Sequence, residues 1–282
     1  MTTVDPRHID PVHIDPVHID TGTEKMLAHV EGGIGWMTYN NPARLNAMSY
    51  EMQIAVPRIL GAFATDPDVH VVVVRGAGDK AFVSGADISE FSEKRTTVAA
   101  RGDYDEALAA AWGSWRTVDK PIIAMIRGYC IGGGLLTAMK TDIRIAATDS
   151  QFGIPAAKLG LGYAYGGVEE LLALVGPSWT AEILFSARRL TADEALHVGL
   201  VNRVVPVDEL ESEVRELAAT IAANAPLTVK ACKVALREAR REPSQRDLDT
   251  IDRLVEACFR SEDYLEGQAA FAEKRAPRFR GV

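Results

Sequence analysis

The feature that most limits how this chain can fold is a repeated order of three segments: an apolar strand, a glycine-rich loop and a helix. The run 69–75 (VHVVVVR) is short and β-branched, which predicts a buried strand, and the glycine-rich segment 76–91 follows it. The run 121–126 (PIIAMI) is a second such strand, and it leads into GYCIGGGLLTAMKTD at 128–142. This alternation predicts a mixed α/β (α+β) layer fold with functional residues on the loops at the strand ends.

The chain divides into three parts by composition. Residues 1–24 contain a five-residue repeat (DPRHI, DPVHI, DPVHI) with a proline in each unit. Proline blocks regular helix, so this part is predicted to be a disordered His-Asp-Pro tail. Residues 25–206 carry the strand, loop and helix units of the predicted core. Residues 207–282 have the pattern of charged amphipathic helices, which predicts a helical region that packs against the core or a partner subunit.

The charge and cysteine content exclude several classes of function. A net charge of −8 and a pI near 5.3 argue against a nucleic-acid or membrane-surface binder. Three widely spaced cysteines indicate a reducing compartment, and the cytoplasm is the expected location. His8, His13 and His18 of the repeat could chelate a metal if the tail folded back. A solvated tail explains them more simply, so no metal site is predicted.

Two loops, here called the glycine loops, are suited to hold one oxygen atom between them. Ser84–Asp87 (SGAD) and Ile131–Gly134 (IGGG) each follow a predicted strand and precede a predicted helix. Glycine lets the backbone approach a ligand closely, and the first N–H groups of a helix have no partner within it. One N–H from each loop could stabilise the enolate of a thioester, and losing one such donor costs about 3 kcal/mol of barrier. Neither loop identifies this chemistry alone, because similar loops occur in plain turns.

Four ordered motifs together resemble the crotonase superfamily, the enoyl-CoA hydratase/isomerase family. They are AFVSGADISEF, KPIIAMIRGYCIGGG, TDIRIAATDSQFGIPAAKLGL and LTADEALHVGLVNRVVP. The resemblance covers residues 25–282 and ends in EGQAAFAEKRAPRF. It implies a crotonase-like spiral of β-β-α repeats, a C-terminal helical trimerisation region, and homotrimers that often pair into hexamers. It also implies an acyl-CoA ligand, with no cofactor beyond the coenzyme A of the thioester substrate.

The resemblance also implies roles for single residues. The backbone N–H groups of Ala86 and Gly133 would form an oxyanion hole. Six positions would contact coenzyme A, the last two reaching that of a neighbouring subunit: Arg44, Ser84, Asp87, Ile88, Phe271 and Lys274. Arginine and lysine suit the phosphates of this ligand. A plain loop and a solvated helix face are the alternatives for Arg44 and Lys274.

The sequence departs from the hydratase pattern at two positions. Hydratases of the family use two glutamates to move protons, and the matching positions here are Leu136 and Ala156. Neither side chain can transfer a proton, and such general acid–base help is worth roughly 10²–10⁴-fold per group. Very little hydratase activity by the familiar route is therefore expected, and Ala156 counts against a familiar isomerase as well.

The loop after Ala156 offers another proton carrier. It reads KLGLGYAYGGVEE, and Tyr163 is the leading candidate because a phenol is a legitimate acid. Methylmalonyl-CoA decarboxylases of the superfamily look similar here, and loss of CO₂ generates an enolate without a base. The alternative for Tyr163 is a wall of the acyl pocket. Glu169 and Glu170 begin the next helix and could favour its N-terminus or point at the acyl tail.

Two functions remain open from the sequence. The first is an acyl-CoA enzyme of lyase type, by decarboxylation or by atypical hydration or isomerisation, with an enolate held at Ala86 and Gly133. The second is a non-catalytic acyl-CoA-binding protein on the same fold, which the residues Leu136 and Ala156 fit equally well.

Overall fold

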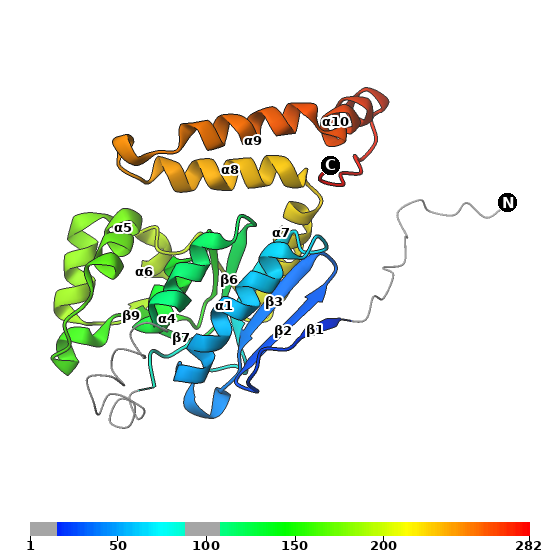
Figure 1. Ribbon diagram of the computed structural model, residues 1–282. Coiled ribbons are helices and arrows are strands. Elements are labelled where there is room, and N and C mark those ends of the chain that lie inside the picture. Colours follow the sequence, from blue (N-terminus) through cyan, green and yellow to red (C-terminus); the bar gives the residue numbers. More distant parts are fainter. Residues whose placement is uncertain (1–15, 88–107) are drawn as a thin grey trace.

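A computed structural model describes residues 16–87 and 108–282 of the chain, and its larger sheet forms the centre of the molecule (Figure 1). The strand order in this sheet is β1-β2-β3-β4-β6-β8-β11. The strands are β1 Val17–Ile19, β2 Met26–Glu31, β3 Ile34–Tyr39, β4 Val71–Gly76, β6 Ile122–Ile126, β8 Ile143–Ala147 and β11 Arg203–Val205. The first three strands pair antiparallel, and the pairings from β3 through β11 are parallel.

A smaller sheet takes strands that alternate along the chain with those of the larger one. Its order is β10-β9-β7-β5, with β5 Ala81–Val83, β7 Tyr129–Ile131, β9 Gln151–Gly153 and β10 Leu190–Thr191. After each of β4, β6 and β8 the chain crosses to the smaller sheet and adds one strand there. This repeated crossing confirms the predicted spiral of β-β-α repeats.

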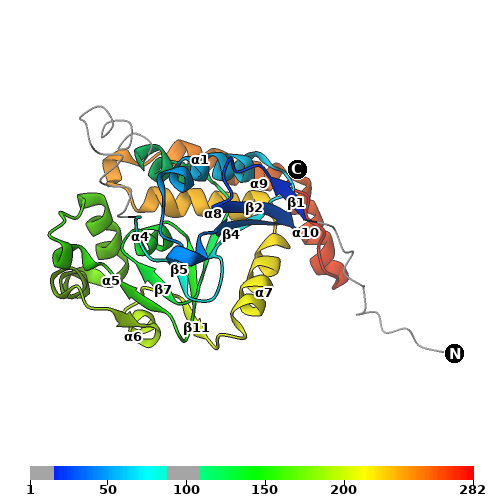
Figure 2. The same ribbon diagram turned by 90° about the horizontal axis from the view of Figure 1, so that it is seen from below.

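Helices cover the sheets and form a separate layer at the C-terminus. The α-helices are α1 Tyr50–Thr65, α4 Gly133–Met139, α5 Tyr165–Ser186, α6 Ala192–His197, α7 Leu210–Ala222, α8 Pro226–Ala239, α9 Leu248–Arg260 and α10 Glu262–Glu273. Short 3-10 turns are η1 Pro42–Arg44, η3 Trp115–Thr117, η4 Pro155–Leu159 and η5 Pro243–Gln245. Figure 2 shows α1 and α7 on opposite sides of the larger sheet.

The core lies on both faces of β4, as a continuous valine run predicts. Val72 and Val74 belong to the cluster that includes the apolar side chains of α1. Val71 and Val73 face the other way and pack with the apolar side of α7. The helix α7 therefore belongs with the core, although it lies beyond residue 207, where the sequence places the boundary. Its buried side chains explain why: Leu210, Val214 and Ala218 are covered by the sheet.

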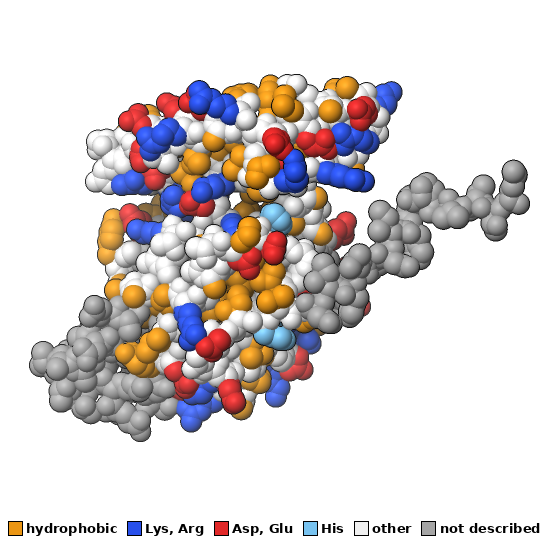
Figure 3. All heavy atoms as spheres, turned by 45° about the vertical axis from the view of Figure 1, so that its right-hand side comes forward, with side chains coloured by type: hydrophobic (Ala, Val, Ile, Leu, Met, Phe, Trp, Pro, Cys, Tyr) orange, Lys and Arg blue, Asp and Glu red, His pale blue; other side chains and the backbone are white. Residues whose placement is uncertain are grey.

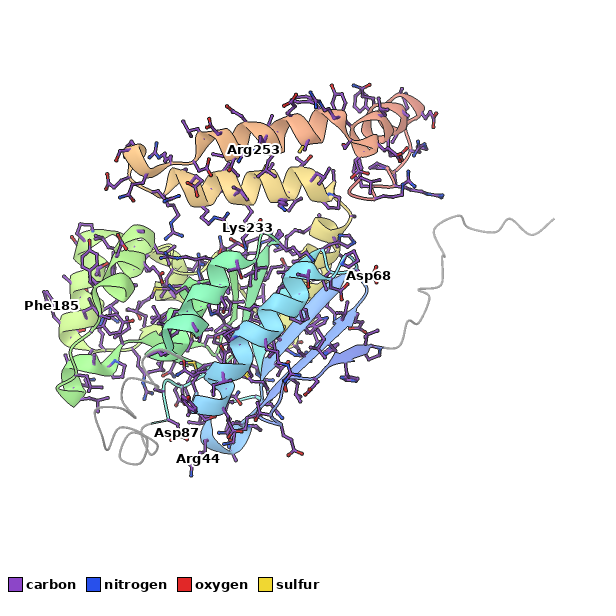
Figure 4. All side chains as sticks on the ribbon, viewed as in Figure 1. Arg44, Asp68, Asp87, Phe185, Lys233 and Arg253 are labelled. Atoms are coloured by element: carbon purple, nitrogen blue, oxygen red, sulfur yellow. The ribbon has the colours of Figure 1, made fainter. Side chains whose placement is uncertain are left out.

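The helices α8, α9 and α10 form the separate layer above the core (Figure 1). Lys233 extends from α8 toward the core (Figure 4), where its Nζ donates to Asp142 Oδ2 at 2.9 Å and to the Lys120 carbonyl at 2.6 Å. Asp142 also accepts from the Ile122 N–H at 2.7 Å. One carboxylate thus joins α8 to the start of β6, and burial lowers the pKa of the Lys233 ammonium.

The prediction of a disordered tail over residues 1–24 is wrong for its last part. Val17–Ile19 of the third repeat forms β1 and pairs with residues Ala28, His29 and Val30 of β2. The pairing is possible because these three residues contain no proline, so each can take part in a strand ladder. His8 and His13 lie outside the described residues.

Candidate active site

The first glycine loop runs beside Met48 in a strand-like arrangement. The Met48 N–H donates to the Gly85 carbonyl at 2.8 Å, and the Asp87 N–H donates to the Met48 carbonyl at 2.9 Å. These bonds bracket Ala86, which forms a parallel bridge with Met48. Because N–H groups alternate in direction along extended backbone, the Ala86 N–H points away from Met48.

The second glycine loop brings Gly133 close to that N–H. Gly133 is the first residue of α4, and a Cβ placed on it would lie 3.6 Å from the Ala86 nitrogen. Gly134 makes this approach possible, because a Cβ there would meet the Val83 carbonyl oxygen of β5 at 2.0 Å. Only glycine lets α4 start so close to β5, so the two predicted donors are brought together by the backbone.

Neither of these two N–H groups donates to an atom of the described residues. Neighbouring amides do have partners: the Gly132 N–H donates to the Gly153 carbonyl at 2.8 Å, and the Asp87 N–H donates to the Met48 carbonyl at 2.9 Å. The Gly133 N–H has no partner within its helix because it lies in the first turn. Two adjacent donors without an internal partner are suited to hold one oxygen that carries developing negative charge.

The residues expected to contact coenzyme A lie at two distant places in one chain. Arg44 and Asp87 lie together beside the first glycine loop (Figure 4), with 3.1 Å between Arg44 Nη1 and Asp87 Oδ2. Ser84 is half-buried in the same loop, whereas Ile88 lies outside the described residues. Phe271 and Lys274 are at the end of α10, in the layer on the other side of the molecule (Figure 1). Phe271 is 89% exposed.

Four side chains, here called the side-chain set, form the next part of the candidate site: Leu136, Ala156, Tyr163 and Glu170. The first three are half-buried and pack against the same core cluster. Leu136 lies one turn into α4, and its N–H bonds to the Gly132 carbonyl. Ala156 follows Pro155, whose Cδ lies 3.9 Å from a Cβ placed on Gly132. Apolar groups therefore lie close to the second glycine loop.

Tyr163 is the half-buried tyrosine of the loop before α5. Its hydroxyl oxygen is enclosed, and burial, followed by the nearby Glu170 carboxylate, raises the pKa of Tyr163 to about 12. Tyr165, in contrast, is 78% exposed. The structure therefore separates the two tyrosines that the sequence could not rank by burial.

The sequence left Lys140 unassigned. Its ammonium pairs with Glu170 Oε1, and both side chains are only 14% exposed. The same ammonium lies 5.8 Å from the centre of the Trp112 ring. The spacing on α4 could have pointed to Lys140, since a residue four positions after Leu136 lies on the same helix face.

The fold and these contacts define a protein whose spiral core holds two backbone donors from separate loops, with the apolar side chains Leu136 and Ala156 close to the second loop. Residues 29–282 match the family model described as enoyl-CoA hydratase/isomerase, and the chain belongs to this family. It therefore processes acyl-CoA thioesters.

Named relatives are similar over nearly their whole length. The chain is 36% identical over 249 residues to a short-chain-enoyl-CoA hydratase of Clostridium acetobutylicum, covering 87% of this chain and 93% of the relative. It is 35% identical over 254 residues to the carnitinyl-CoA dehydratase of Salmonella typhi, covering 89% and 96%. An enoyl-CoA hydratase/carnithine racemase structure from Magnetospirillum magneticum matches with a TM-score of 0.85 and 36% identity, covering 92% of this chain and 97% of that one.

Two features are absent from the part of the chain that the structure describes. No helix in it is long and apolar enough to cross a membrane. Within the same residues, no three His, Cys, Asp or Glu side chains gather as a set of metal ligands.

Proposed function

We propose that the protein is a lyase that acts on an acyl-CoA thioester through its enolate. The thioester oxygen would accept hydrogen bonds from the Ala86 and Gly133 N–H groups. The observation that carries this proposal is the 3.6 Å between the Ala86 nitrogen and a Cβ placed on Gly133. This distance places the two loops side by side, and N–H donors fixed in place by the backbone stabilise charge as it develops, without reorganising during the reaction.

Tyr163 is the proposed proton carrier. A phenol with a pKa of about 12 keeps its proton at neutral pH, so it can donate to the α-carbon of an enolate, which is far more basic. Addition of water across the Cα–Cβ double bond of an enoyl thioester, or its reversal, is the reaction we favour. In this reaction the Tyr163 phenol would give its proton to the α-carbon, and the resulting phenolate would take a proton from the water that adds at the β-carbon. The relatives named hydratase and dehydratase support it, with Tyr163 acting where family glutamates are expected.

Decarboxylation is the second candidate, and the apolar pair Leu136 and Ala156 favours it. Such a surface would desolvate a carboxylate that leaves as CO₂, and the reaction needs only a proton donor afterwards. The Glu170 carboxylate near Tyr163 counts against it, because two negative charges in one enclosed site repel each other.

The ligand, assembly and location are also proposals. Arg44, Ser84, Asp87 and Ile88 would contact coenzyme A in one subunit, and Phe271 and Lys274 would reach it from the next. A homotrimer or a hexamer would bring these groups together. An apolar groove of about 730 Å³ between α8, α9 and α10 supports an assembly of this kind, and Figure 3 shows hydrophobic side chains among the charged ones on this helical layer. The three free cysteines fit the cytoplasm.

Turnover of a small set of thioesters tests the proposal. Crotonyl-CoA, 3-hydroxybutyryl-CoA and methylmalonyl-CoA are each mixed with the protein, and product and CO₂ are followed. Turnover that falls in Tyr163→Phe but not in Tyr165→Phe supports the lyase. Tight acyl-CoA binding with no product from any of the three supports the non-catalytic binder instead.

A further inference from the structure

One residue outside the two glycine loops contacts both of them. The backbone of Met48 is bonded to the first loop on either side of Ala86, by its N–H to the Gly85 carbonyl and by its carbonyl to the Asp87 N–H. Its side chain reaches the second loop, because a Cβ placed on Gly133 would lie 2.5 Å from Met48 Cε. The same Cβ would lie 3.6 Å from the Ala86 nitrogen. The Met48 methyl group therefore fills the space beside both loops that a side chain on Gly133 would otherwise take.

The side chain of Met48 lies against the first turn of α4 with more than its methyl group. Thr137, which is fully buried, is one turn further along α4 than Gly133, and its hydroxyl donates to the Gly133 carbonyl at 2.9 Å. Thr137 Oγ1 also lies 3.7 Å from Met48 Sδ. The sulfur and the methyl group of Met48 thus contact the helical turn that begins with the Gly133 N–H.

The backbone just before Met48 is fixed without the help of the glycine loops. Leu45 and Asn46 both have a φ of 54°, in the left-handed region that few residues other than glycine adopt. The fully buried Asn46 side chain holds this conformation, since its Nδ2 donates to the Ala77 carbonyl at 2.9 Å and to the Ala81 carbonyl at 2.7 Å. Met48 is therefore carried by a segment with a fixed position, and its side chain can act as a spacer.

The length of the Met48 side chain decides whether it reaches Gly133. Leucine ends one atom earlier than methionine, so it has no atom at the position of Met48 Cε. A void of this size in a packed interior removes the contacts on one side of its lining and allows the neighbouring elements to shift. A misplacement of about 1 Å between reacting groups can lower a rate by about 10²-fold.

We propose that Met48 is a positioning residue, which holds the two glycine loops at the separation where the Ala86 and Gly133 N–H groups reach one oxygen. This inference rests on the proposed function, since it assigns those two groups to a thioester oxygen. Core packing alone is the alternative, because Met48 is 5% exposed and belongs to the same core cluster as Met37. Met37, however, lies in β3 of the larger sheet, whereas the glycine loops follow β5 and β7 of the smaller one.

Bound acetoacetyl-CoA measures this role without any turnover. Its second carbonyl makes the enolate stable enough to titrate, and the enolate is followed by its ultraviolet absorbance. The midpoint pH of enolate formation is compared between the free ligand and the ligand bound to the original protein, to Met48→Leu and to Met37→Leu. We expect the original protein to lower this midpoint. Met48→Leu should raise it again by about one pH unit, a tenfold loss of enolate stabilisation.

Met37→Leu is the matched control, since it makes the same chemical change in the same core cluster. It should leave the midpoint within about 0.3 pH unit of the original, a twofold change. The uncharged keto form should bind to all three proteins with affinities within about threefold, because it has not yet developed the charge that the two N–H groups stabilise. Equal midpoints in Met48→Leu and Met37→Leu would overturn the positioning role, whatever their melting temperatures.

A double variant tests the spacer itself. In the original protein the Cβ of Gly133→Ala meets the Met48 methyl group, whereas in Met48→Leu this methyl group is absent and the Cβ can take its space. We expect the loss of enolate stabilisation caused by Gly133→Ala to be at least about threefold smaller in the Met48→Leu background. An equal loss in both backgrounds would contradict a spacer at Met48.

The result is distinct from failure of the lyase proposal. A midpoint that depends on Met48, without turnover of any thioester, supports the positioning role and contradicts the lyase. Turnover by a protein whose midpoint is the same in Met48→Leu supports the lyase and contradicts the positioning role. A bound enolate that titrates as it does in water would contradict both.

Discussion

The glycine loops and the side-chain set supply two different kinds of chemical group to the candidate site. The glycine loops present backbone N–H groups, whose positions follow from the close approach of α4 to β5 at Gly134. The side-chain set presents Leu136, Ala156, Tyr163 and Glu170, and each can change without altering the backbone. The comparison teaches that, under the proposed function, the backbone would set where a thioester oxygen is held, while a few side chains would decide what happens to the acyl group.

The largest expected effect comes from removing a backbone donor. Gly133→Pro deletes the N–H at the first position of α4, where proline is compatible with a helix. We expect kcat to fall by roughly 10²–10³-fold for each thioester that the enzyme turns over. Steady-state kinetics measures this fall in kcat.

Gly133→Ala is the control for this change. It adds a Cβ that meets the flexible end of Met48 but keeps the N–H. If Gly133→Ala and Gly133→Pro lose activity equally, crowding rather than the donor explains the loss, and the glycine loops lose their assigned role.

The next effect is on the side-chain set. Tyr163→Phe should lower kcat by about 10²-fold, the lower range for a general acid, with acyl-CoA affinity nearly unchanged. The split between kcat and affinity is the informative readout, because the proposal assigns the binding of the thioester to the backbone and the proton transfer to Tyr163. Unchanged kcat in Tyr163→Phe would remove this residue from the proton transfer.

A smaller gain is expected when a carboxylate is returned to the set. Ala156→Glu places a carboxylic acid where the hydratases of the family are expected to have one. We expect the rate of crotonyl-CoA hydration to rise by about 10-fold. This is below the full 10²–10⁴-fold range of a general acid or base, because the neighbouring residues do not position the new carboxylate. Ala157→Glu, on an exposed neighbour, is the matched control. An equal rise in both variants would show that position 156 has no special access to the substrate.

The smallest effect concerns the titration of Tyr163. Its pKa is raised to about 12 in the folded protein, so this phenol should ionise at a higher pH than an ordinary tyrosine. A raised folded-state pKa adds stability that is present below the unfolded value of 10.0 and is lost as the pH rises through about 12. Ultraviolet difference titration of the original protein against Tyr163→Phe measures it.

Glu170→Gln separates the two causes of the raised pKa of Tyr163. Burial is the larger cause and the Glu170 charge the smaller one, so this variant should lower the pKa of Tyr163 only in part. A Tyr163 that titrates like an exposed tyrosine in the original protein would contradict its enclosure beside Glu170.

The sequence predicts the backbone part of the site better than the side-chain part. Glycine patterns between a strand and a helix carry local information that locates the two glycine loops, whereas the choice of Ala86 and Gly133 follows from the family resemblance and stays a prediction. The Lys140–Glu170 pair joins residues 30 positions apart on two helices, and no local pattern reports which of two adjacent glutamates turns inward. Strand β1 was not predicted, because the prolines of the repeat favour a disordered tail although the three residues after the last of these prolines can pair with β2.

The order of strands, loops and helices in the sequence was sufficient to predict the fold class. It was not sufficient to predict at which residue the C-terminal helical layer begins. The charged pattern after residue 207 looks uniform in sequence. Only the sheet shows that α7 covers β4 whereas α8 to α10 form the separate layer.

A crystal structure with a bound hydroxyacyl-CoA or a stable thioester analogue tests the central claim most directly. We predict the thioester oxygen within about 2.7–3.1 Å of both the Ala86 and the Gly133 nitrogens, with the acyl chain running past Leu136 toward Tyr163. A bound ligand whose thioester oxygen lies away from both nitrogens would contradict the account.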